Sequence, residues 1–147
     1  MIHIRGAEQE DFAAICMLMK NELGYPGLNE AGAVRRLEYF SQCDDRATFV
    51  AVIDNEVSGF IGIKKGMEYT IDGFCAEILI LAVSEKTRRS GVGTALVKKA
   101  EEWAYQNNAF EIGLHSNFKR QGAHIFYERN GYIKGSYWFY KKLDGLI

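Results

Sequence analysis

The 147-residue sequence contains a single proline, Pro26, and only three cysteines, Cys16, Cys43 and Cys75. Their odd number, wide spacing and lack of a C-x-x-C pair argue against a disulfide framework and a cysteine metal site, so we expect a reducing compartment and no metal. No stretch approaches about 18 consecutive apolar residues, and no apolar run follows a basic start at the N-terminus. We therefore expect a cytoplasmic protein that does not enter a membrane.

The sequence also lacks an excess of either charge. Its 18 basic and 19 acidic residues give a formal net charge of −1, so no domain-wide positive field exists to bind nucleic acid. Hydrophobic residues make up 48% of the chain, enough for a proper core, and no linker, repeat or low-complexity tract interrupts it. The length and composition predict one domain over residues 1–147.

The N-terminal half has the periodicity of a strand followed by two helices. Residues 3–5 read as a strand, and apolar residues recur at three- and four-residue spacing from Phe12 to Leu23, which predicts a helix. Asn29 is a suitable N-cap for a second helix.

Beyond residue 46 the pattern changes to that of a sheet. β-rich runs at residues 48–53 and 56–63 are separated by Asp54 and Asn55, which tolerate positive φ and close hairpins. Gly59 and Gly62 predict bulges within the second run.

The C-terminal half predicts a parallel crossover. Residues 76–83 are apolar apart from Glu77, as in a central strand, and an amphipathic helix and a strand at 110–114 follow. A short helix is expected to end at Asn130 and Gly131, and residues 132–143 predict one or two closing strands. The element order indicates a mixed α/β layer fold.

The turn before the long helix has the chemistry of an anion site. Free backbone N–H groups at a helix start attract anions, and Gly91 and Gly93 allow close approach, while Arg88 and Arg89 add charge. A diphosphate would suit this turn. Neither the P-loop pattern nor the G-x-G-x-x-G dinucleotide pattern fits, because the Gly-Lys pair of the first and the third glycine of the second are missing.

The residues Arg88-Arg89-Ser90-Gly91-Val92-Gly93 match [Q/R]-x-x-G-x-[G/A] at every specified position. This stretch resembles the acyl-CoA loop of the GNAT superfamily of N-acetyltransferases. Residues 77–83 resemble that family's central strand, and 124–132 its F-Y-x-x-x-G-[F/Y] segment. The resemblance covers nearly the whole chain and implies a GNAT-like α/β fold. We expect a mostly antiparallel sheet of six to seven strands with a splayed parallel pair and about four helices.

The resemblance implies acetyl-CoA as the acyl donor. The pantetheine would hydrogen-bond along the central strand, the pyrophosphate would lie on the loop, and Asn117 would contact the CoA arm or, alternatively, cap the next helix. The residues implied in donor binding are Leu81, Ala82, Val83, Arg88, Arg89, Ser90, Gly91, Val92, Gly93, Thr94, Asn117 and Tyr127.

Two residues are implied in proton transfer. By resemblance, Tyr127 would protonate the departing thiolate and Glu77 would act as general base, directly or through water. We expect Glu77 on the same side of its strand as Leu81; a rim carboxylate held by a lysine is the alternative. His115 is a competing base, and His124 could orient Tyr127. Cys75 has no activating base at a diagnostic spacing and is interpreted as structural.

The acceptor is expected to be a small-molecule amine, because residues 117–127 are similar to GNAT branches that act on aminoglycoside-like and aminoalkylphosphonate acceptors. Acidic and aromatic groups would favour a cation. A peptide or protein N-terminal acetyltransferase and a catalytically idle acyl-CoA-binding regulatory domain remain alternatives. A homodimer is common among similar proteins. The acceptor-site candidates are Tyr25, Glu68, Tyr69, His115 and Trp138.

Overall fold

The computed structural model describes residues 1–116 and 120–143. Asn117 lies outside the described residues, so its predicted contact to the CoA arm stays a prediction. The chain forms two units, Met1–Leu114 and His115–Ile147.

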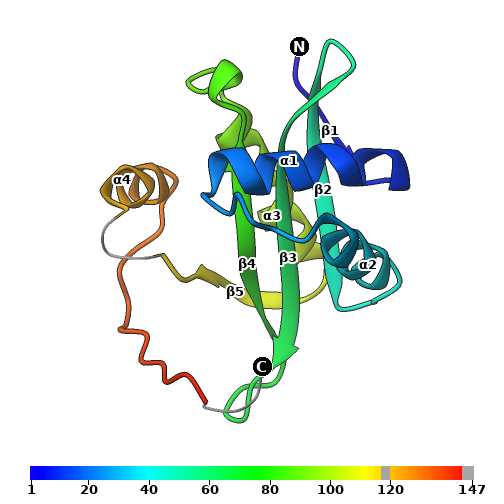
Figure 1. Cartoon of the computed structure of the whole chain (residues 1–147). Helices are drawn as coiled ribbons and strands as arrows, with labels where there is room; N and C mark the ends of the chain where they lie inside the picture. Colours follow the sequence, from blue (N-terminus) through cyan, green and yellow to red (C-terminus); the bar gives the residue numbers. More distant parts are fainter. Residues whose placement is uncertain (117–119, 144–147) are drawn as a thin grey trace. The chain divides into compact units, whose positions relative to one another are not determined.

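The first unit contains the sheet and most of the helices (Figure 1). Its elements are β1 His3–Gly6, the 3₁₀ turn η1 Gln9–Asp11, α1 Phe12–Glu22, α2 Glu30–Ser41, β2 Arg46–Ile53, β3 Glu56–Met67, β4 Phe74–Val83, the 3₁₀ turn η2 Glu85–Thr87, α3 Val92–Gln106 and β5 Ala109–Leu114. The second unit contains α4, Gln121–Arg129. This order confirms the predicted succession of elements as far as α4.

Local sequence signals produced the expected caps and turns. The Asn29 side chain accepts a hydrogen bond from the Gly32 N–H at 2.9 Å and starts α2. Asp54 and Asn55 have φ of 50° and 66°, the left-handed pair that joins β2 to β3 in a tight hairpin. Both predictions are confirmed.

The strands form one mixed sheet in the order β1-β2-β3-β4-β5. The first four pair antiparallel, and β4 and β5 pair parallel, as the crossover through α3 requires. The register shifts between Ala51 and Val52, opposite Gly59, and again between Gly62 and Ile63. The bulge predicted at Gly59 is confirmed, since Ser58 is an extra residue of β3, whereas the bulge at Gly62 lies in the partner strand β4 and not in β3.

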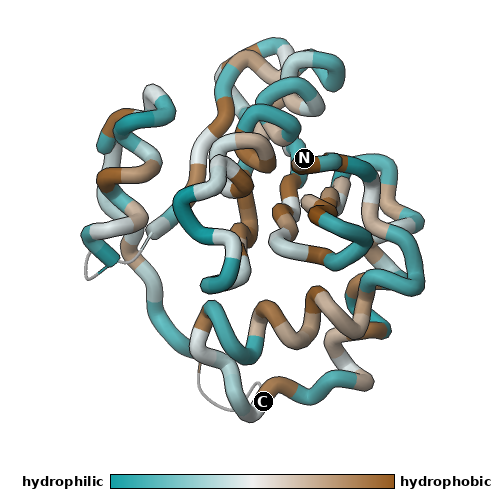
Figure 2. The backbone as a smooth tube through the Cα atoms, turned by 90° about the horizontal axis from the view of Figure 1, so that it is seen from above, coloured by the Kyte–Doolittle hydropathy of each residue, from teal (hydrophilic) through white to brown (hydrophobic). Residues whose placement is uncertain are grey.

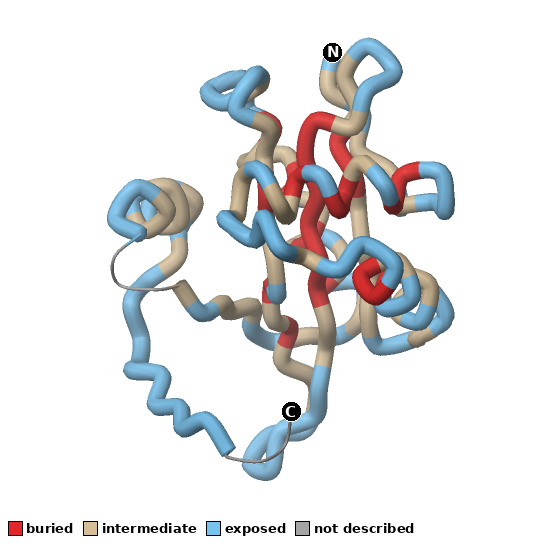
Figure 3. Tube along the Cα trace, viewed as in Figure 1, coloured by how far each residue is buried: buried red, intermediate tan, exposed pale blue. Residues whose placement is uncertain are grey.

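Helices cover both faces of this sheet. In Figure 1, α1 and α2 lie in front of the strands and α3 lies behind them. Figure 2 shows brown and teal stretches alternating along the helices, as amphipathic helices require. Figure 3 places the buried residues of this unit along the central strands and the inner helix turns. The core on the α1 and α2 face includes Phe12, Ile15, Leu37, Val50 and Phe60.

Strand β1 is tied to the start of α1 by a bidentate ion pair. The Arg5 guanidinium donates to both oxygens of the Asp11 carboxylate, at 2.7 and 3.0 Å, and the Glu8 N–H donates to the same carboxylate at 2.7 Å. The Arg5 hydrogen bonds hold the pKa of Asp11 below its usual value. The pair closes one edge of the sheet onto the helix layer.

The predicted number of strands is wrong. The sheet has five strands, not six to seven, because no described residue of 132–143 pairs with a neighbouring strand. Strand-forming composition supplies propensity, but a strand exists only where its N–H and C=O groups find a partner. The large side chains of this stretch are exposed, including Ile133, Tyr137 and Phe139. Figure 3 shows the stretch in pale blue.

Candidate active site

Strands β4 and β5 separate halfway along β4. Their parallel pairing ends at Ile78 and Leu114, and β4 continues for residues 79–83. Among the described residues, no strand pairs with that side of β4 beyond Ile78. Figure 1 shows β5 running away from β4. The divergence leaves main-chain donors and acceptors of the central strand open on one edge, as the predicted splayed pair requires.

The register with β3 decides which groups face this open edge. The Ser84 N–H donates to the Ser58 carbonyl at 2.8 Å, so Ser84 turns its backbone toward β3. Backbone groups alternate sides along a strand, so Ala82 also faces β3, whereas Leu81 and Val83 face the open edge. The edge therefore offers the backbone groups of Leu81 and Val83, while Ala82 belongs to the core.

The loop between β4 and α3 has the shape of an anion site. Arg89 has a φ of 67° and Gly91, the N-cap of α3, a φ of 88°. Within the described chain, the first N–H of α3 to reach a helical acceptor is that of Ala95, which donates to Gly91 at 3.0 Å. The amides of residues 92–94 are thus available to a ligand at the positive end of a 15-residue helix. The Val92 side chain is buried, so only its backbone can contribute.

The two arginines of this loop differ in their surroundings. Arg88 donates to the Glu22 carboxylate at the end of α1 at 2.7 Å. Arg89 is exposed, and no described residue forms an ion pair with it. The Ser90 hydroxyl donates to the Thr87 carbonyl, which holds the loop from within. Arg89 is therefore the arginine whose guanidinium is available to an anion.

The first turns of α3 pack closely against the sheet at Gly59. A Cβ at this position would lie 2.9 Å from the Ala82 carbonyl oxygen, 3.0 Å from Val92 Cγ1 and 3.1 Å from Leu96 Cδ1. Only glycine allows this approach. We call the connection between β4 and α3, together with the first turn of α3, the anion loop. Gly59 thereby fixes where the amides of this anion loop lie relative to the open edge of β4.

Glu77 lies on the opposite face of the sheet from the one predicted. Ile80 stands opposite Gly62 and Ile78 opposite Ile63, so Leu79 is an extra residue in β4. This bulge interrupts the alternation, so Glu77, paired with Lys64, shares a face with Ile80, and Leu81 lies on the other face. Ile80 packs against the core under α1 and α2. The expectation that Glu77 and Leu81 share a side is therefore wrong.

Glu77 has a lysine neighbour on β3. Lys64 Nζ lies 3.8 Å from a carboxylate oxygen of Glu77, and both side chains are partly exposed. This ion pair is the arrangement expected for a rim carboxylate. It also holds a carboxylate beside the bulge at which β5 leaves β4, so the contact by itself is compatible with either role.

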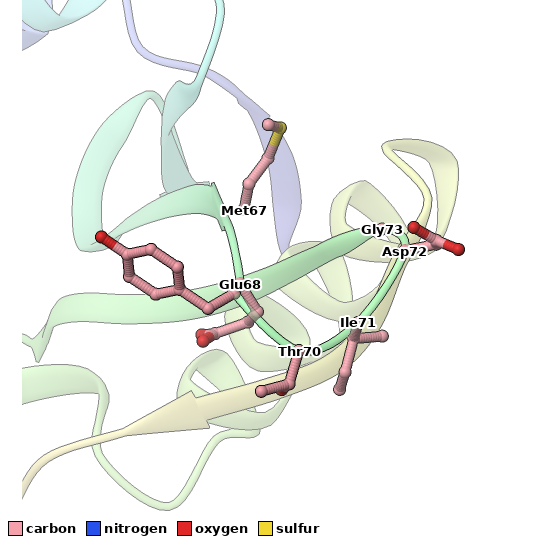
Figure 4. A pocket seen from close by; sticks show the side chains of 7 residues that line it. Met67, Glu68, Thr70, Ile71, Asp72 and Gly73 are labelled. Carbon is pink, nitrogen blue, oxygen red and sulfur yellow. The ribbon is translucent and has the colours of Figure 1, made fainter.

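The loop between β3 and β4 contains a pocket of about 350 Å³, lined by residues 67–73 (Figure 4). Two of the acceptor-site candidates, Glu68 and Tyr69, lie here, and Tyr69 is fully exposed. In Figure 4 the side chains of Glu68 and Asp72 point away from each other. Tyr25 is exposed on the connection between α1 and α2.

Cys75 lies in β4 beside acidic neighbours. Its thiol contacts a Glu111 carboxylate oxygen at 3.8 Å. Burial, followed by the hydrogen bonds and charges of Glu68 and Glu111, raises the pKa of Cys75 to about 11. The thiol is thus protonated at neutral pH and is a poor nucleophile, as expected for a structural cysteine.

The second unit carries Tyr127 on α4. Its ring makes edge contacts with Phe126 and Tyr132, with centroids 5.2 and 5.9 Å apart. Burial raises the pKa of Tyr127 above its usual value, so the phenol keeps its proton at neutral pH. The predicted helix end is confirmed, because Gly131 has a φ of 90° and the Tyr132 N–H donates to the Tyr127 carbonyl at 3.0 Å.

His115 and Trp138 are brought together in this unit. Their ring centroids lie 4.2 Å apart with an interplanar angle of 46°. His115 follows β5 directly, and Trp138 belongs to the aromatic stretch at the C-terminus. His124 lies on α4, one turn before Tyr127. The sequence had placed His115 and Trp138 in one acceptor site without predicting their contact.

Two contacts important to this geometry have no local signal in the sequence. Glu22 holds Arg88 across 66 residues, and Lys64 pairs with Glu77. Gly59 had a local signal, because a glycine inside a β-rich run indicates a bulge or a close backbone approach, and here it allows both. The first two contacts depend on partners that no local pattern connects.

No group of three or more His, Cys, Asp and Glu side chains within residues 1–116 and 120–143 is placed to hold a metal ion. No helix formed by these residues is long and apolar enough to cross a membrane.

Residues 14–132 match the acetyltransferase (GNAT) family. Over 145 residues, the chain is 33% identical to an aminoalkylphosphonate N-acetyltransferase of Salmonella typhimurium, a match that covers 95% of this chain and 90% of that protein. It is 30% identical over 121 residues to the human N-alpha-acetyltransferase 30, covering 81% of this chain but only 33% of that relative. An aminoglycoside N-acetyltransferase solved in complex with CoA superposes with a TM-score of 0.87 at 16% identity, covering 98% of this chain and 95% of its own, and shares the fold.

Proposed function

The chain belongs to the acetyltransferase (GNAT) family, and on that basis we propose that it transfers an acetyl group from acetyl-CoA to a primary amine of a small molecule. The observation that carries the proposal is the open edge of β4 that runs directly into the anion loop. One ligand with a peptide-like arm and a diphosphate matches both features. Acetyl-CoA has this combination, and the thioester supplies the activated acetyl group.

The donor is bound mainly by main-chain groups in this proposal. The amide and carbonyl groups of Leu81 and Val83 pair with the amides of the pantetheine arm, much as an added strand would. The diphosphate lies at the start of α3, where the amides of residues 92–94 and the Arg89 guanidinium neutralise it. Backbone contacts of this kind fix the position of the thioester without requiring particular side chains.

The reaction is a direct attack of the amine on the thioester, which chiefly needs positioning and proton transfer. Glu77 accepts a proton from the incoming amine, directly or through water, while Lys64 holds its side chain on the sheet. Tyr127 donates its phenol proton to the departing thiolate. The phenol of a tyrosine has an ordinary pKa of about 10 and is therefore protonated at neutral pH when the thiolate forms.

The acceptor is a small amine rather than a peptide N-terminus. This choice is supported by the Salmonella typhimurium relative, whose match extends over 90% of its length. The similarity to the human N-alpha-acetyltransferase 30 favours a peptide N-terminus as the second candidate. Exposed Glu68, Tyr69 and Tyr25 are suited to a cationic acceptor through charge and ring-face contacts.

The proposal is tested by following CoA release from acetyl-CoA with aminoalkylphosphonates, aminoglycosides, polyamines, amino acids and short peptides as acceptors. We expect saturable turnover with at least one small amine and none with peptides. Gly91→Val is the donor-site control, because the φ of 88° at Gly91 is strained for a branched residue next to the diphosphate. This variant should fold but bind acetyl-CoA more weakly. Turnover with peptides alone would support the second candidate, and donor binding without any turnover would support an idle binding domain.

The two candidate bases are separated by their variants. Glu77→Gln should lower turnover most at low pH, where less free amine is available, and leave acetyl-CoA affinity nearly unchanged. His115→Ala is the comparison. If His115→Ala shows this pattern and Glu77→Gln does not, the base is His115.

A further inference from the structure

The last residue of α1 makes two contacts with the segment that precedes the anion loop. One carboxylate oxygen of Glu22 accepts from Arg88 Nη2 at 2.7 Å, and the other accepts from the Glu85 N–H at 3.2 Å. The Glu22 side chain is 15% exposed and that of Arg88 55% exposed. Glu22 thus joins the helix layer to both ends of η2.

The position of Glu22 is unfavourable by the local rules of helix stability. A carboxylate at the C-terminal end of a helix faces the negative end of the helix dipole, where a cation is favoured. The partial burial of Glu22 adds a desolvation cost. Its two contacts outside the helix offset these costs. The Glu22 side chain therefore stabilises the segment that it contacts rather than its own helix.

The loop that follows has an uncommon backbone conformation that neighbouring residues must stabilise. Arg88 is extended, with φ of −60° and ψ of 148°, and Arg89 has a φ of 67°, an uncommon conformation for a residue with a side chain. Such conformations persist when the surrounding structure determines them. The Glu22 contacts fix Glu85 and Arg88, the two residues that lead the chain into this turn.

We propose that Glu22 is a positioning residue for the diphosphate of the acyl donor, which acts by anchoring Arg88 and Glu85; this rests on the proposed function. In this arrangement the Arg88 guanidinium holds the loop in place, and Arg89 and the α3 amides contact the anion. Glu22 never touches the donor. The assignment replaces the interpretation of Arg88 as a direct ligand.

Removal of the Glu22 carboxylate should weaken donor binding if Glu22 positions the loop, and strengthen it if only charge repulsion matters. A carboxylate close to a diphosphate site repels the ligand, so its removal should strengthen binding if charge alone matters. If Glu22 positions the loop, its removal should weaken binding even though a repulsive charge is lost. Glu22→Gln keeps the shape of the side chain, removes its charge and replaces one of its two acceptor oxygens with an amide donor, so it can accept only one of the two hydrogen bonds.

The test measures acetyl-CoA affinity and turnover for Glu22→Gln, Arg88→Gln and the double variant. We expect each single variant to raise the KM for acetyl-CoA about three- to fivefold with kcat nearly unchanged, the range that a partly exposed ion pair allows. The double variant should be no worse than either single one, because both remove the same contact. Arg89→Gln should weaken binding independently and add to each of them.

Acetyl-pantetheine, which lacks the diphosphate, is the diagnostic donor. Its KM should be the same for the wild type and Glu22→Gln, because the loop acts only on the diphosphate. Glu102→Gln is the matched control, since it removes one carboxylate from an exposed ion pair with Lys99 on α3. It should leave both KM values unchanged. A KM that rises equally for both donors would overturn the proposal, as would a Glu22→Gln variant that binds acetyl-CoA as tightly as the wild type or more tightly.

Amide hydrogen exchange on the free protein separates this proposal from the proposed function. We expect faster exchange at residues 85–91 in Glu22→Gln and Arg88→Gln than in the wild type or Glu102→Gln. Unchanged exchange would refute the anchoring role regardless of any activity. If exchange increases but the wild type shows no saturable acetyl-CoA binding, the proposed function and the role in donor binding fail together, and the contact only orders the loop.

Discussion

A methyl group added at Gly59 would clash with the atoms through which α3 packs against the sheet. The added Cβ would lie 2.9 Å from the Ala82 carbonyl oxygen, and 3.0 and 3.1 Å from methyl groups of Val92 and Leu96. The carbonyl belongs to the central strand, and Val92 and Leu96 are 1% and 0% exposed. Because the nearest neighbour is a backbone atom and both methyl groups are buried, we expect Gly59→Ala to push α3 away from the sheet.

Overpacking a core by one methyl group costs typically about 1–3 kcal/mol, and a contact with a strand carbonyl belongs to the upper part of that range. Replacing glycine also restricts the unfolded chain, which offsets about 0.4–1 kcal/mol. We expect Gly59→Ala to lower the free energy of unfolding by about 1–2.5 kcal/mol, which corresponds to a Tm lower by roughly 3–8 °C.

Gly66→Ala is the matched control, because Gly66 lies on the same strand and a Cβ there would meet nothing within 4 Å. Urea titration and thermal melting of both variants give the comparison. Gly66→Ala should be as stable as the wild type or slightly more stable. Gly59→Ala should also bind acetyl-CoA more weakly, because Val92 begins the helix that carries the loop amides. Equal unfolding midpoints for the two variants would refute the argument from the close approach.

Three further predictions concern protonation. Tyr127→Phe should lower kcat on the order of 10²-fold with little change in the KM for acetyl-CoA, and turnover within about twofold of the wild type would show that water supplies the proton. The Arg5 contact lowers the pKa of Asp11, so the stability that it contributes is present above the unfolded value of about 4 and lost as the pH falls through the lower folded value. In urea titrations, the stability difference between the wild type and Asp11→Asn should therefore vanish in acid, and a difference independent of pH would contradict this assignment. Because the pKa of Cys75 is about 11, its alkylation by iodoacetamide at pH 8, followed by peptide mass mapping, should be roughly 100-fold slower than that of a thiol with the usual pKa of 9. A rate equal to that of such a thiol would show that Cys75 is not buried in this way.

Features that depend on a few neighbouring residues were predictable from the sequence. Asn29 caps α2 and Asp54-Asn55 forms the hairpin turn, since each acts on its own backbone or on residues within three positions. The same holds for the glycine that starts α3 and for the glycine that ends α4. The parallel pairing of β4 and β5 followed from the strand-helix-strand order, because consecutive strands can run parallel only when a long connection such as a helix joins them.

The wrong prediction of closing strands at 132–143 shows that local sequence composition does not predict strand pairing. That stretch has the composition of a strand, yet its described residues pair with no other strand. Composition measures how well a residue suits a sheet, whereas pairing depends on a second segment with free hydrogen-bonding groups at the right place. The same limit applies to the side of the sheet on which a residue lies.

The sequence by itself determined the family, the order of elements up to α4 and the glycine turn at the start of α3, because glycines, helix starts and apolar periodicity act over a few residues. Only the tertiary structure decided the details of the site. An extra residue at Leu79 turned Glu77 to the other face, and the Glu22 contact removed Arg88 from the set of free cations. Both results arise between segments that lie far apart in the chain, where register and helix packing, rather than local propensity, set which groups meet.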